Sequence, residues 1–100
     1  MNTQTQTPVQ TIDINAKEWF DKVNGNSYFS GSVSVNYGTP DAQTFDLPFQ
    51  YGYGDSYIYA GIKKLNELGI LTTERTHELR ESGVIVRNYI QRNCKKRDLK

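Results

Sequence analysis

The stretch from Phe45 to Leu68 constrains the fold most strongly, because its hydrophobic period changes partway along. Its first apolar residues recur at every second position, which predicts one face of a strand. They are Phe45, Leu47, Phe49 and Tyr51. After Asp55 the apolar residues follow helical spacing instead, at Ile58, Ile62 and Leu65. A loop rich in glycine and tyrosine joins the two halves, so we expect sheet before the loop and at least one helix after it.

The chain from Val9 to Gln50 has the pattern of an antiparallel sheet. Apolar residues alternate with polar ones in its first part, as in a half-buried strand. They are Ile12, Ile14 and Ala16. From Lys17 to Val23 the apolar order fits neither period, which predicts a bulge or a short second strand. Asn24-Gly25 then predicts a two-residue type I′ hairpin, since this turn needs positive φ at both central positions.

The return strand of this hairpin shows a clear alternation between two faces. The apolar face is predicted to hold Phe29, Gly31, Val33, Val35 and Tyr37, and the polar face Tyr28, Ser30, Ser32, Ser34 and Asn36. Turn residues from Gly38 to Asp41 should lead into a third, antiparallel strand. Pro48 cannot donate a ladder hydrogen bond, so we expect this third strand at an edge of the sheet.

Two helices and a last strand are predicted after the loop. The first helix should span Ser56 to Leu68, capped by Asp55 or Ser56 and ended by Gly69. The second should span Glu74 to Ser82, with Thr72 or Thr73 as its cap, Leu79 as its core contact and Gly83 as its stop. Residues 84–92 could continue that helix, but the β-branched run Val84-Ile85-Val86 favours a strand. Asn93 to Lys100 could form a short helical turn or a tail.

These elements together predict an α+β fold. Residues 1–8 are polar and should form a disordered tail, while residues 9–100 should form a single domain. Within it, a small antiparallel sheet should carry the main helix on one face, with a short second helix and a C-terminal strand. The helix residues Ile58, Ile62 and Leu65 are expected to pack against Phe29, Val33, Val35, Phe45 and Leu47.

Composition and residue counts argue against several classes of protein. No stretch has the apolar length of a membrane span, and the polar N-terminus does not resemble a signal peptide, so we expect a cytoplasmic protein. One cysteine and one histidine allow no internal disulfide and no cysteine-histidine zinc site, so neither a metal nor a cofactor is expected. His77 should be a surface histidine. Cys94 lies among basic residues that would make its thiol more reactive, but no base is placed to use it, so we expect no enzyme.

The tyrosines around the glycine loop are one candidate binding surface. They are Tyr51, Tyr53, Tyr57 and Tyr59. The loop precedes a helix N-terminus, where anions are favoured, but it lacks the nucleotide-binding fingerprints, and Asp55 would occupy the anion position. Its glycines are more simply explained by a tight turn. The concentrated aromatic area would still suit recognition of a partner protein or of stacked bases.

The basic C-terminal segment is the second candidate surface. From Val84 onward the chain carries six basic residues and one acidic residue, a net charge of plus five. Its candidate binding residues are Arg87, Tyr89, Arg92, Lys95, Lys96 and Arg97. Such a cluster can neutralise phosphates, although a charged terminus is more often simply solvated.

Three runs of the sequence resemble a family of small uncharacterised bacteriophage proteins. They are Glu18 to Ser30 (EWFDKVNGNSYFS), Leu47 to Asp55 (LPFQYGYGD) and Asn93 to Asp98 (NCKKRD). The resemblance covers most of the chain after the tail. It implies a phage origin and the host cytoplasm, but it brings no ligand and no catalytic residue. By analogy with other small phage accessory proteins, it implies a role as an inhibitor that binds a host defence component or nucleic-acid enzyme.

Two functions of different classes follow from these observations. The first is protein–protein interaction through a tyrosine-rich face, with a host or phage protein as the partner. The alternative is nucleic-acid binding through the basic C-terminal segment. A net charge of only plus one over the whole chain favours the first. A homo-oligomer is compatible with either function.

Overall fold

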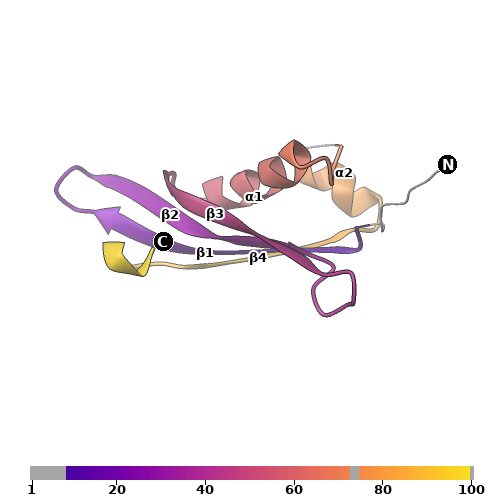
Figure 1. The fold of residues 1–100 in the computed structure, drawn as a ribbon. Helices are drawn as coiled ribbons and strands as arrows, with labels where there is room; N and C mark the ends of the chain where they lie inside the picture. Colours follow the sequence, from indigo (N-terminus) through magenta and orange to yellow (C-terminus); the bar gives the residue numbers. More distant parts are fainter. Residues whose placement is uncertain (1–8, 73–74, 100) are drawn as a thin grey trace.

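The computed structural model describes residues 9–72 and 75–99, which form an α+β structure (Figure 1). The strands are β1 (Thr11–Asp21), β2 (Asn26–Val35), β3 (Gln43–Tyr51) and β4 (Ile85–Gln91). The helices are α1 (Ser56–Glu67) and α2 (Thr76–Glu81), and a 3₁₀ turn, η1 (Lys96–Asp98), follows β4. The predicted α+β class is confirmed, whereas the predicted tail at residues 1–8 lies outside the described residues.

The four strands form one sheet in the order β3-β2-β1-β4. β1 pairs antiparallel with β2, and β2 pairs antiparallel with β3. β4 pairs parallel with β1, from Thr11 opposite Ile85 to Lys17 opposite Gln91. The predicted C-terminal strand is therefore confirmed over the helical alternative, and it makes the sheet mixed, because the two helices carry the chain from β3 across to β1.

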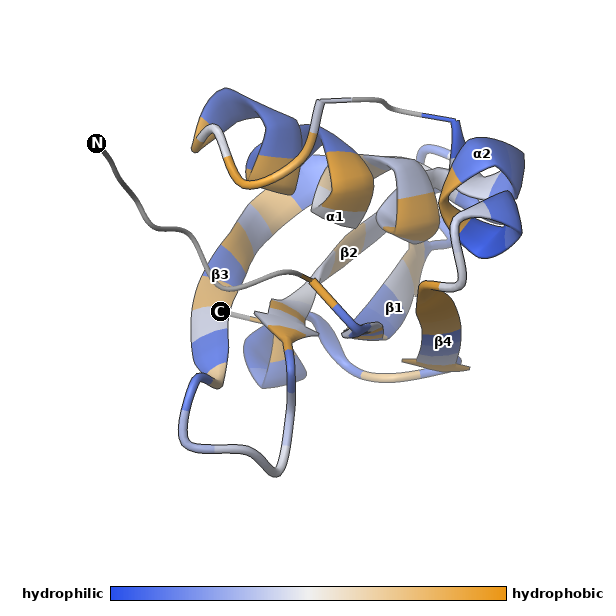
Figure 2. Ribbon diagram, turned by 90° about the vertical axis from the view of Figure 1, so that its right-hand side faces the viewer, coloured by the Kyte–Doolittle hydropathy of each residue, from blue (hydrophilic) through white to orange (hydrophobic). Residues whose placement is uncertain are grey.

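Both helices lie on one side of the sheet, and no described element other than the C-terminal segment lies on the other side (Figures 1 and 2). The interior between the layers contains Ile12, Ile14, Ala16, Phe29, Val33, Val35, Leu47, Tyr57, Ile62, Leu65, Leu71 and Leu79. Gly61 allows α1 to approach β1 closely, because a Cβ there would lie 3.0 Å from the Ile14 side chain. Ile62 and Leu65 are fully buried and Ile58 is half-buried, as the helical spacing predicted. We call the sheet surface away from the helices the open face.

The first hairpin differs from its prediction in two ways. β1 continues without a break to Asp21, so the predicted bulge or second strand between Lys17 and Val23 is wrong. The turn is also longer than two residues, because Asp21 pairs with Asn26. Only Gly25 has positive φ in this turn, at 71°, and its N–H donates to the Asp21 carbonyl at 2.7 Å. The carboxylate of Asp21 accepts further hydrogen bonds from Val23 and Asn24, which stabilises this longer turn without a type I′ geometry.

The alternation of β2 is confirmed as far as Val35 and ends there. Asn36 has a left-handed backbone, with φ 53°, and its side-chain oxygen accepts from the Gln10 N–H at 2.7 Å. Tyr37 was predicted on the buried face but is 69% exposed. The cause is the turn at Asn36, which takes the chain out of the strand one residue before Tyr37.

The helices begin and end close to the predicted residues. Gly69 ends α1 with φ 77°, and the Ile70 N–H folds back to the Leu65 carbonyl. Asp55 holds the N-cap position without a side-chain hydrogen bond, while the Ser56 hydroxyl donates to the Tyr53 carbonyl at 2.7 Å.

The second helix is shorter than predicted. Leu79 is its buried residue, and Gly83 follows it with φ 92°, as expected. Arg75 takes the N-cap position, so Thr72 is not the cap, and the alternative cap Thr73 and the predicted start at Glu74 lie outside the described residues.

Candidate functional site

A β-bulge in β3 determines which side chains reach the open face. Gly31 lies opposite Leu47, but Phe29 lies opposite Gln50, so β3 has one residue more than β2 between these pairs. A single extra residue moves every following side chain to the opposite face. Leu47 is therefore buried under α1, while Phe49 and Tyr51 contact aromatic rings of the open face. The predicted common face for these three residues is wrong beyond Leu47.

Pro48 lies at this bulge, and β3 is an edge strand, as its proline predicted. An edge strand has backbone groups that face away from the sheet, so a missing N–H is tolerated there. The proline and the extra residue thus lie in an edge strand, where they do not interrupt the hydrogen bonds between two inner strands.

Five aromatic side chains contact one another on the open face, and we call them the aromatic cluster. They are Trp19 from β1, Tyr28 from β2, Phe49 and Tyr51 from β3, and Tyr53 from the following loop. Their ring centroids are separated by 5.5 Å for Trp19 and Tyr28, 5.2 Å for Tyr28 and Phe49, and 5.9 Å for Tyr28 and Tyr51. Tyr51 is 60% exposed and Tyr53 is 66% exposed. The cluster is therefore ordered by its own contacts while much of its outer area stays in contact with solvent.

The C-terminal segment lies beside this cluster and is fixed there by several contacts. The Cys94 N–H donates to the Glu18 carbonyl at 2.9 Å, and the Glu18 carboxylate pairs with Arg92 at 3.0 Å. In η1 the Asp98 carboxylate accepts from the Lys95 N–H at 3.0 Å. These contacts place the Lys96 ammonium over the Trp19 ring, 5.5 Å from its centroid, which is a cation–π geometry.

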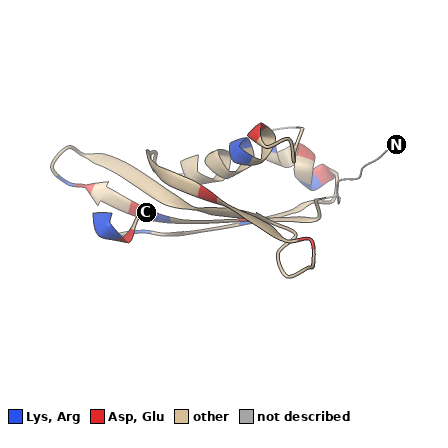
Figure 3. Cartoon of the chain, in the orientation of Figure 1, with Lys and Arg blue, Asp and Glu red and all other residues tan. Residues whose placement is uncertain are grey.

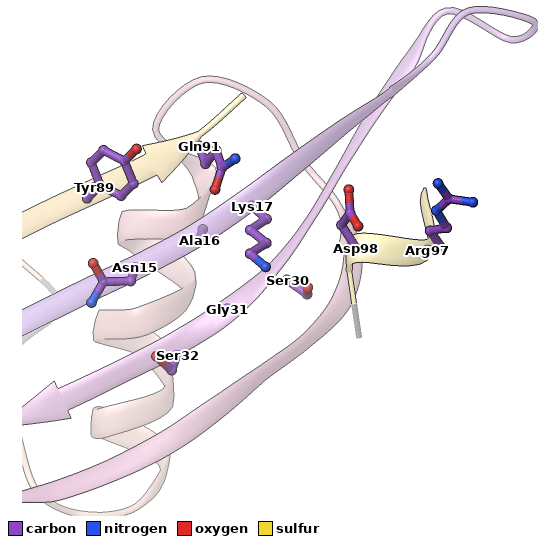
Figure 4. Close-up of a pocket in the computed structure, with 10 residues that line it drawn as sticks. All are labelled: Asn15, Ala16, Lys17, Ser30, Gly31, Ser32, Tyr89, Gln91, Arg97 and Asp98. Carbon is purple, nitrogen blue, oxygen red and sulfur yellow. The ribbon is translucent and has the colours of Figure 1, made fainter. Parts of the chain in front are cut away.

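A hollow of about 660 Å³ lies on the open face (Figure 4), and its lining residues Lys17 and Ser30 are two positions along their strands from Trp19 and Tyr28 of the cluster. Its lining residues come from three strands and η1, and the polar ones are Asn15, Lys17, Ser30, Ser32, Tyr89, Gln91, Arg97 and Asp98. Lys17 extends from β1 across to Ser30 on β2, whereas Arg97 directs its guanidinium away from the strands (Figure 4). The hollow therefore presents hydroxyl groups, amide groups and one lysine, and it lies next to the aromatic cluster.

Basic residues follow one another at η1, which lies on the open-face side of the sheet (Figure 3). Lys95, Lys96 and Arg97 are consecutive there and Asp98 is the acidic residue beside them. Farther along the sheet, Arg87 forms a bidentate pair with Asp13, at 2.7 and 3.1 Å. The hydrogen bond that Arg87 donates to Asp13, together with the charge of Asp13, raises the pKa of Arg87. Among the described residues of this face, the consecutive cations Lys95, Lys96 and Arg97 therefore concentrate positive charge beside the aromatic cluster.

The four tyrosines of the predicted surface do not lie on one surface. Tyr51 and Tyr53 belong to the aromatic cluster. Tyr57 is buried in the core, where its hydroxyl donates to the Asn88 side-chain oxygen at 3.0 Å and burial raises its pKa. Tyr59 is 63% exposed, but it projects from α1 in the other layer. The change of period at the loop explains this separation, because consecutive odd positions share a face in a strand and not in a helix.

The basic candidates are likewise divided. Arg87 and Arg92 are held in ion pairs with Asp13 and Glu18. Lys95, Lys96 and Arg97 stay together at η1, and Tyr89 is exposed on β4 beside the hollow.

Sequence reasoning missed several residues of this site. They are Trp19, Tyr28 and Phe49 of the aromatic cluster and Lys17 of the hollow. Trp19 lies directly opposite Tyr28 in the first hairpin, so a correct register of that hairpin would have paired them. Phe49 lies on the open face because of the bulge at Pro48. The alternating pattern of the sequence gives no sign of this bulge.

Other kinds of site find little support in the described residues. Among them, no group of three His, Cys, Asp or Glu side chains is placed to hold a metal ion. The Cys94 thiol donates to the Gln91 carbonyl at 3.4 Å and is half-buried. His77 is exposed on α2. None of the described helices has the length and apolar character to cross a membrane.

The chain matches no family model, no curated protein and no solved structure. Any assignment of function therefore depends on the chemistry of the aromatic cluster, the hollow and the basic C-terminal segment.

Proposed function

We propose that this chain is a small phage-type accessory protein that binds a partner protein through the aromatic cluster. The observation that carries the proposal is the set of five contacting aromatic side chains on the sheet face opposite to α1 and α2. Exposed apolar patches of this kind usually mark interaction sites, and Trp and Tyr are the residues most enriched in binding hot spots. The ring contacts hold the cluster in place before binding, which reduces the entropy lost on association.

The charge around the cluster indicates what the partner surface should carry. Lys95, Lys96 and Arg97 lie on one side of the rings, and Lys17 lies in the adjoining hollow. A surface that presents carboxylates around an apolar centre would complement this arrangement. The proposed partner is therefore a protein with an acidic rim around its contact site.

The resemblance to small phage proteins supports a host protein as the partner and the host cytoplasm as the place of action. A host defence component or a nucleic-acid enzyme would fit this proposal, and blocking its surface would be the mechanism of inhibition. The proposal assigns no catalytic step to this chain.

Nucleic-acid binding is the second candidate, favoured by the consecutive basic residues at η1 beside exposed tyrosines. Stacking on a base requires an accessible ring face. Trp19, Tyr28 and Phe49 turn their ring faces toward one another, with interplanar angles of 25° and 12° between neighbours, and Lys96 lies over Trp19. A base would have to displace these contacts, which supports the protein partner over the nucleic acid.

Affinity capture from a bacterial lysate, with and without nuclease, tests the proposal. The informative variant combines Trp19→Ala with Phe49→Ala, and the matched control is Tyr59→Ala, an exposed tyrosine in the helical layer. Circular dichroism should first show that each variant is folded. We expect a captured protein that survives nuclease, is lost with the double variant and is retained with Tyr59→Ala. Capture that nuclease abolishes would favour the second candidate, and capture that the double variant retains would contradict the proposed surface.

A further inference from the structure

The outer edge of β4 has unpaired backbone groups. β4 is the last strand of the sheet, and its one neighbour is β1. The Ile85 N–H donates to the Gln10 carbonyl at 3.0 Å, which sets the direction of its backbone groups. Because these groups alternate along a strand, those of Val86, Asn88 and Ile90 face away from β1. Within residues 9–72 and 75–99, no hydrogen bond is made to these outward groups.

This edge also lacks the devices that protect edge strands from pairing. Proteins usually protect such edges with proline, bulges or charged side chains. β3, at the opposite edge, has Pro48 and a bulge. β4 has neither proline nor glycine, and Arg87 is its one charged residue. Arg87 lies on the open face and pairs with Asp13, and the helix side of this edge, formed by Val86, Asn88 and Ile90, carries no charge.

We propose that β4 pairs with β4 of a second copy of this chain, antiparallel and centred on Asn88. In this register all three outward-facing residues find a hydrogen-bonding counterpart. Asn88 lies opposite Asn88 of the second copy, and Val86 lies opposite Ile90 of the second copy. The two sheets then form one continuous sheet of eight strands, with an aromatic cluster at each end.

The side chains of β4 are compatible with this register on both faces. On the helix side, Val86 and Ile90 are half-buried apolar residues, and they would contact each other across the new pair. On the open face, Arg87 lies opposite Tyr89 of the second copy, which places a guanidinium beside an aromatic ring. Moving the centre by one residue toward the N-terminus would place Arg87 opposite Arg87, so the like charges disfavour that register.

The second copy is the favoured occupant because the strand is complementary to itself, which the symmetry of a two-fold pair requires. Pairing of one short edge strand buries a small area, so we expect reversible association at high protein concentration. This inference does not depend on the proposed function, since the aromatic cluster takes no part in the β4 contact.

Sedimentation velocity of the full chain, from about 10 µM to 1 mM, measures the association. We expect a concentration-dependent shift from monomer to dimer. Tyr89→Lys places a second cation opposite Arg87 and should weaken the dimer at least about tenfold, while the matched Tyr89→Glu places an anion there and should not weaken it. Tyr89 is largely exposed, so both variants should fold. A monomer at every concentration, or equal effects of the two variants, would overturn the proposal.

Amide hydrogen exchange gives a second readout at the outward positions. The amides of Val86, Asn88 and Ile90 should exchange rapidly at low concentration and slowly at high concentration. The amides of Arg87 and Tyr89, which face β1, should be protected at both. Outward amides that exchange equally fast at both concentrations would exclude pairing at this edge. A dimer that the Trp19→Ala and Phe49→Ala double variant abolishes would assign association to the aromatic cluster and also overturn the proposal.

Discussion

Tyr28 and Phe49 stack across the β2–β3 pair with their ring centroids 5.2 Å apart and an interplanar angle of 12°. The contact exists because the bulge at Pro48 moves Phe49 to the open face, away from the side that holds Leu47. The bulge thus lets Phe49 join the aromatic cluster while Leu47, two positions earlier, stays in the core.

Deletion of Pro48 tests this description of the bulge. Without the extra residue, Phe49 would directly follow Leu47 and would still point to the open face, so the cluster should persist. We expect near-ultraviolet circular dichroism of Trp19 to be retained, and the free energy of unfolding to change by about 1 kcal/mol or less. If β3 alternated strictly instead, the deletion would move Phe49 and Tyr51 from one face to the other. A lost aromatic signal together with a large loss of stability would show that the bulge is assigned wrongly.

Ile62→Ala tests the packing of α1 on the sheet. Ile62 is fully buried beneath the helix, so removing three carbon atoms leaves a cavity against β1 and β2. We expect the free energy of unfolding to fall by about 2 to 5 kcal/mol, measured by denaturant titration. Lys63→Ala, at an exposed position of the same helix, should change it by less than about 0.5 kcal/mol. Similar values for the two variants would contradict the helix-on-sheet assignment.

The fold was predictable where the spacing of apolar residues, or a single turn residue, depends directly on the local backbone geometry. The β2 alternation, the helical spacing from Ile58 to Leu65 and the stops at Gly69 and Gly83 each depend on a few neighbouring residues. The parallel pairing of β4 with β1 was not predictable in this way. It depends on where the two helices place the following segment relative to the sheet. The longer turn before β2 was also missed, since the Asp21 carboxylate organises it through hydrogen bonds that Asn24-Gly25 does not reveal.

Substitution of either glycine between β3 and α1 should disturb the fold, for a different physical reason at each position. Gly54 has φ 59°, so Gly54→Val should destabilise the fold by about 1 to 2 kcal/mol, and Gly54→Asn by less. At Gly52 a Cβ would lie 2.5 Å from Phe29 Cε1 and 2.9 Å from Ser56 Cβ, so Gly52→Ala should displace the start of α1. Thermal melting and amide exchange at Ser56 measure both effects. Unchanged melting of both variants would show that this loop does not determine the helix start.

The first hairpin turn should lose stability in acid. The side-chain hydrogen bond from Asn24, aided by the backbone N–H groups of Asn24 and Val23, lowers the pKa of Asp21 below its ordinary value. A carboxyl whose pKa is lowered by folding stabilises the folded state above its unfolded pKa, and that contribution disappears as pH falls through the folded pKa. Asp21→Asn should therefore reduce stability at neutral pH, with a difference that vanishes in strong acid. In an NMR titration, Asn24→Ala should raise the pKa of Asp21, and an unchanged value would refute this cause.

The candidate site was only partly predictable from the sequence. Tyr51, Tyr53 and the run Lys95 to Arg97 were named as candidate binding residues and are exposed, but their neighbours across the sheet were not named. Contacts between strands depend on register, and register depends on the turn before β2 and on the bulge in β3. An error of one residue in either element places an aromatic side chain on the wrong face.

Site-specific photocrosslinking tests the central claim, that the aromatic cluster on the open face binds a partner protein. A photoreactive phenylalanine analogue replaces Tyr51 in one protein and Tyr59 in another, since both tyrosines are exposed but lie in different layers. Each protein is irradiated in a bacterial lysate before and after nuclease treatment. We expect a discrete protein adduct from position 51 that survives nuclease, and no matching adduct from position 59. An adduct that nuclease removes, or one formed equally from both positions, would contradict the account.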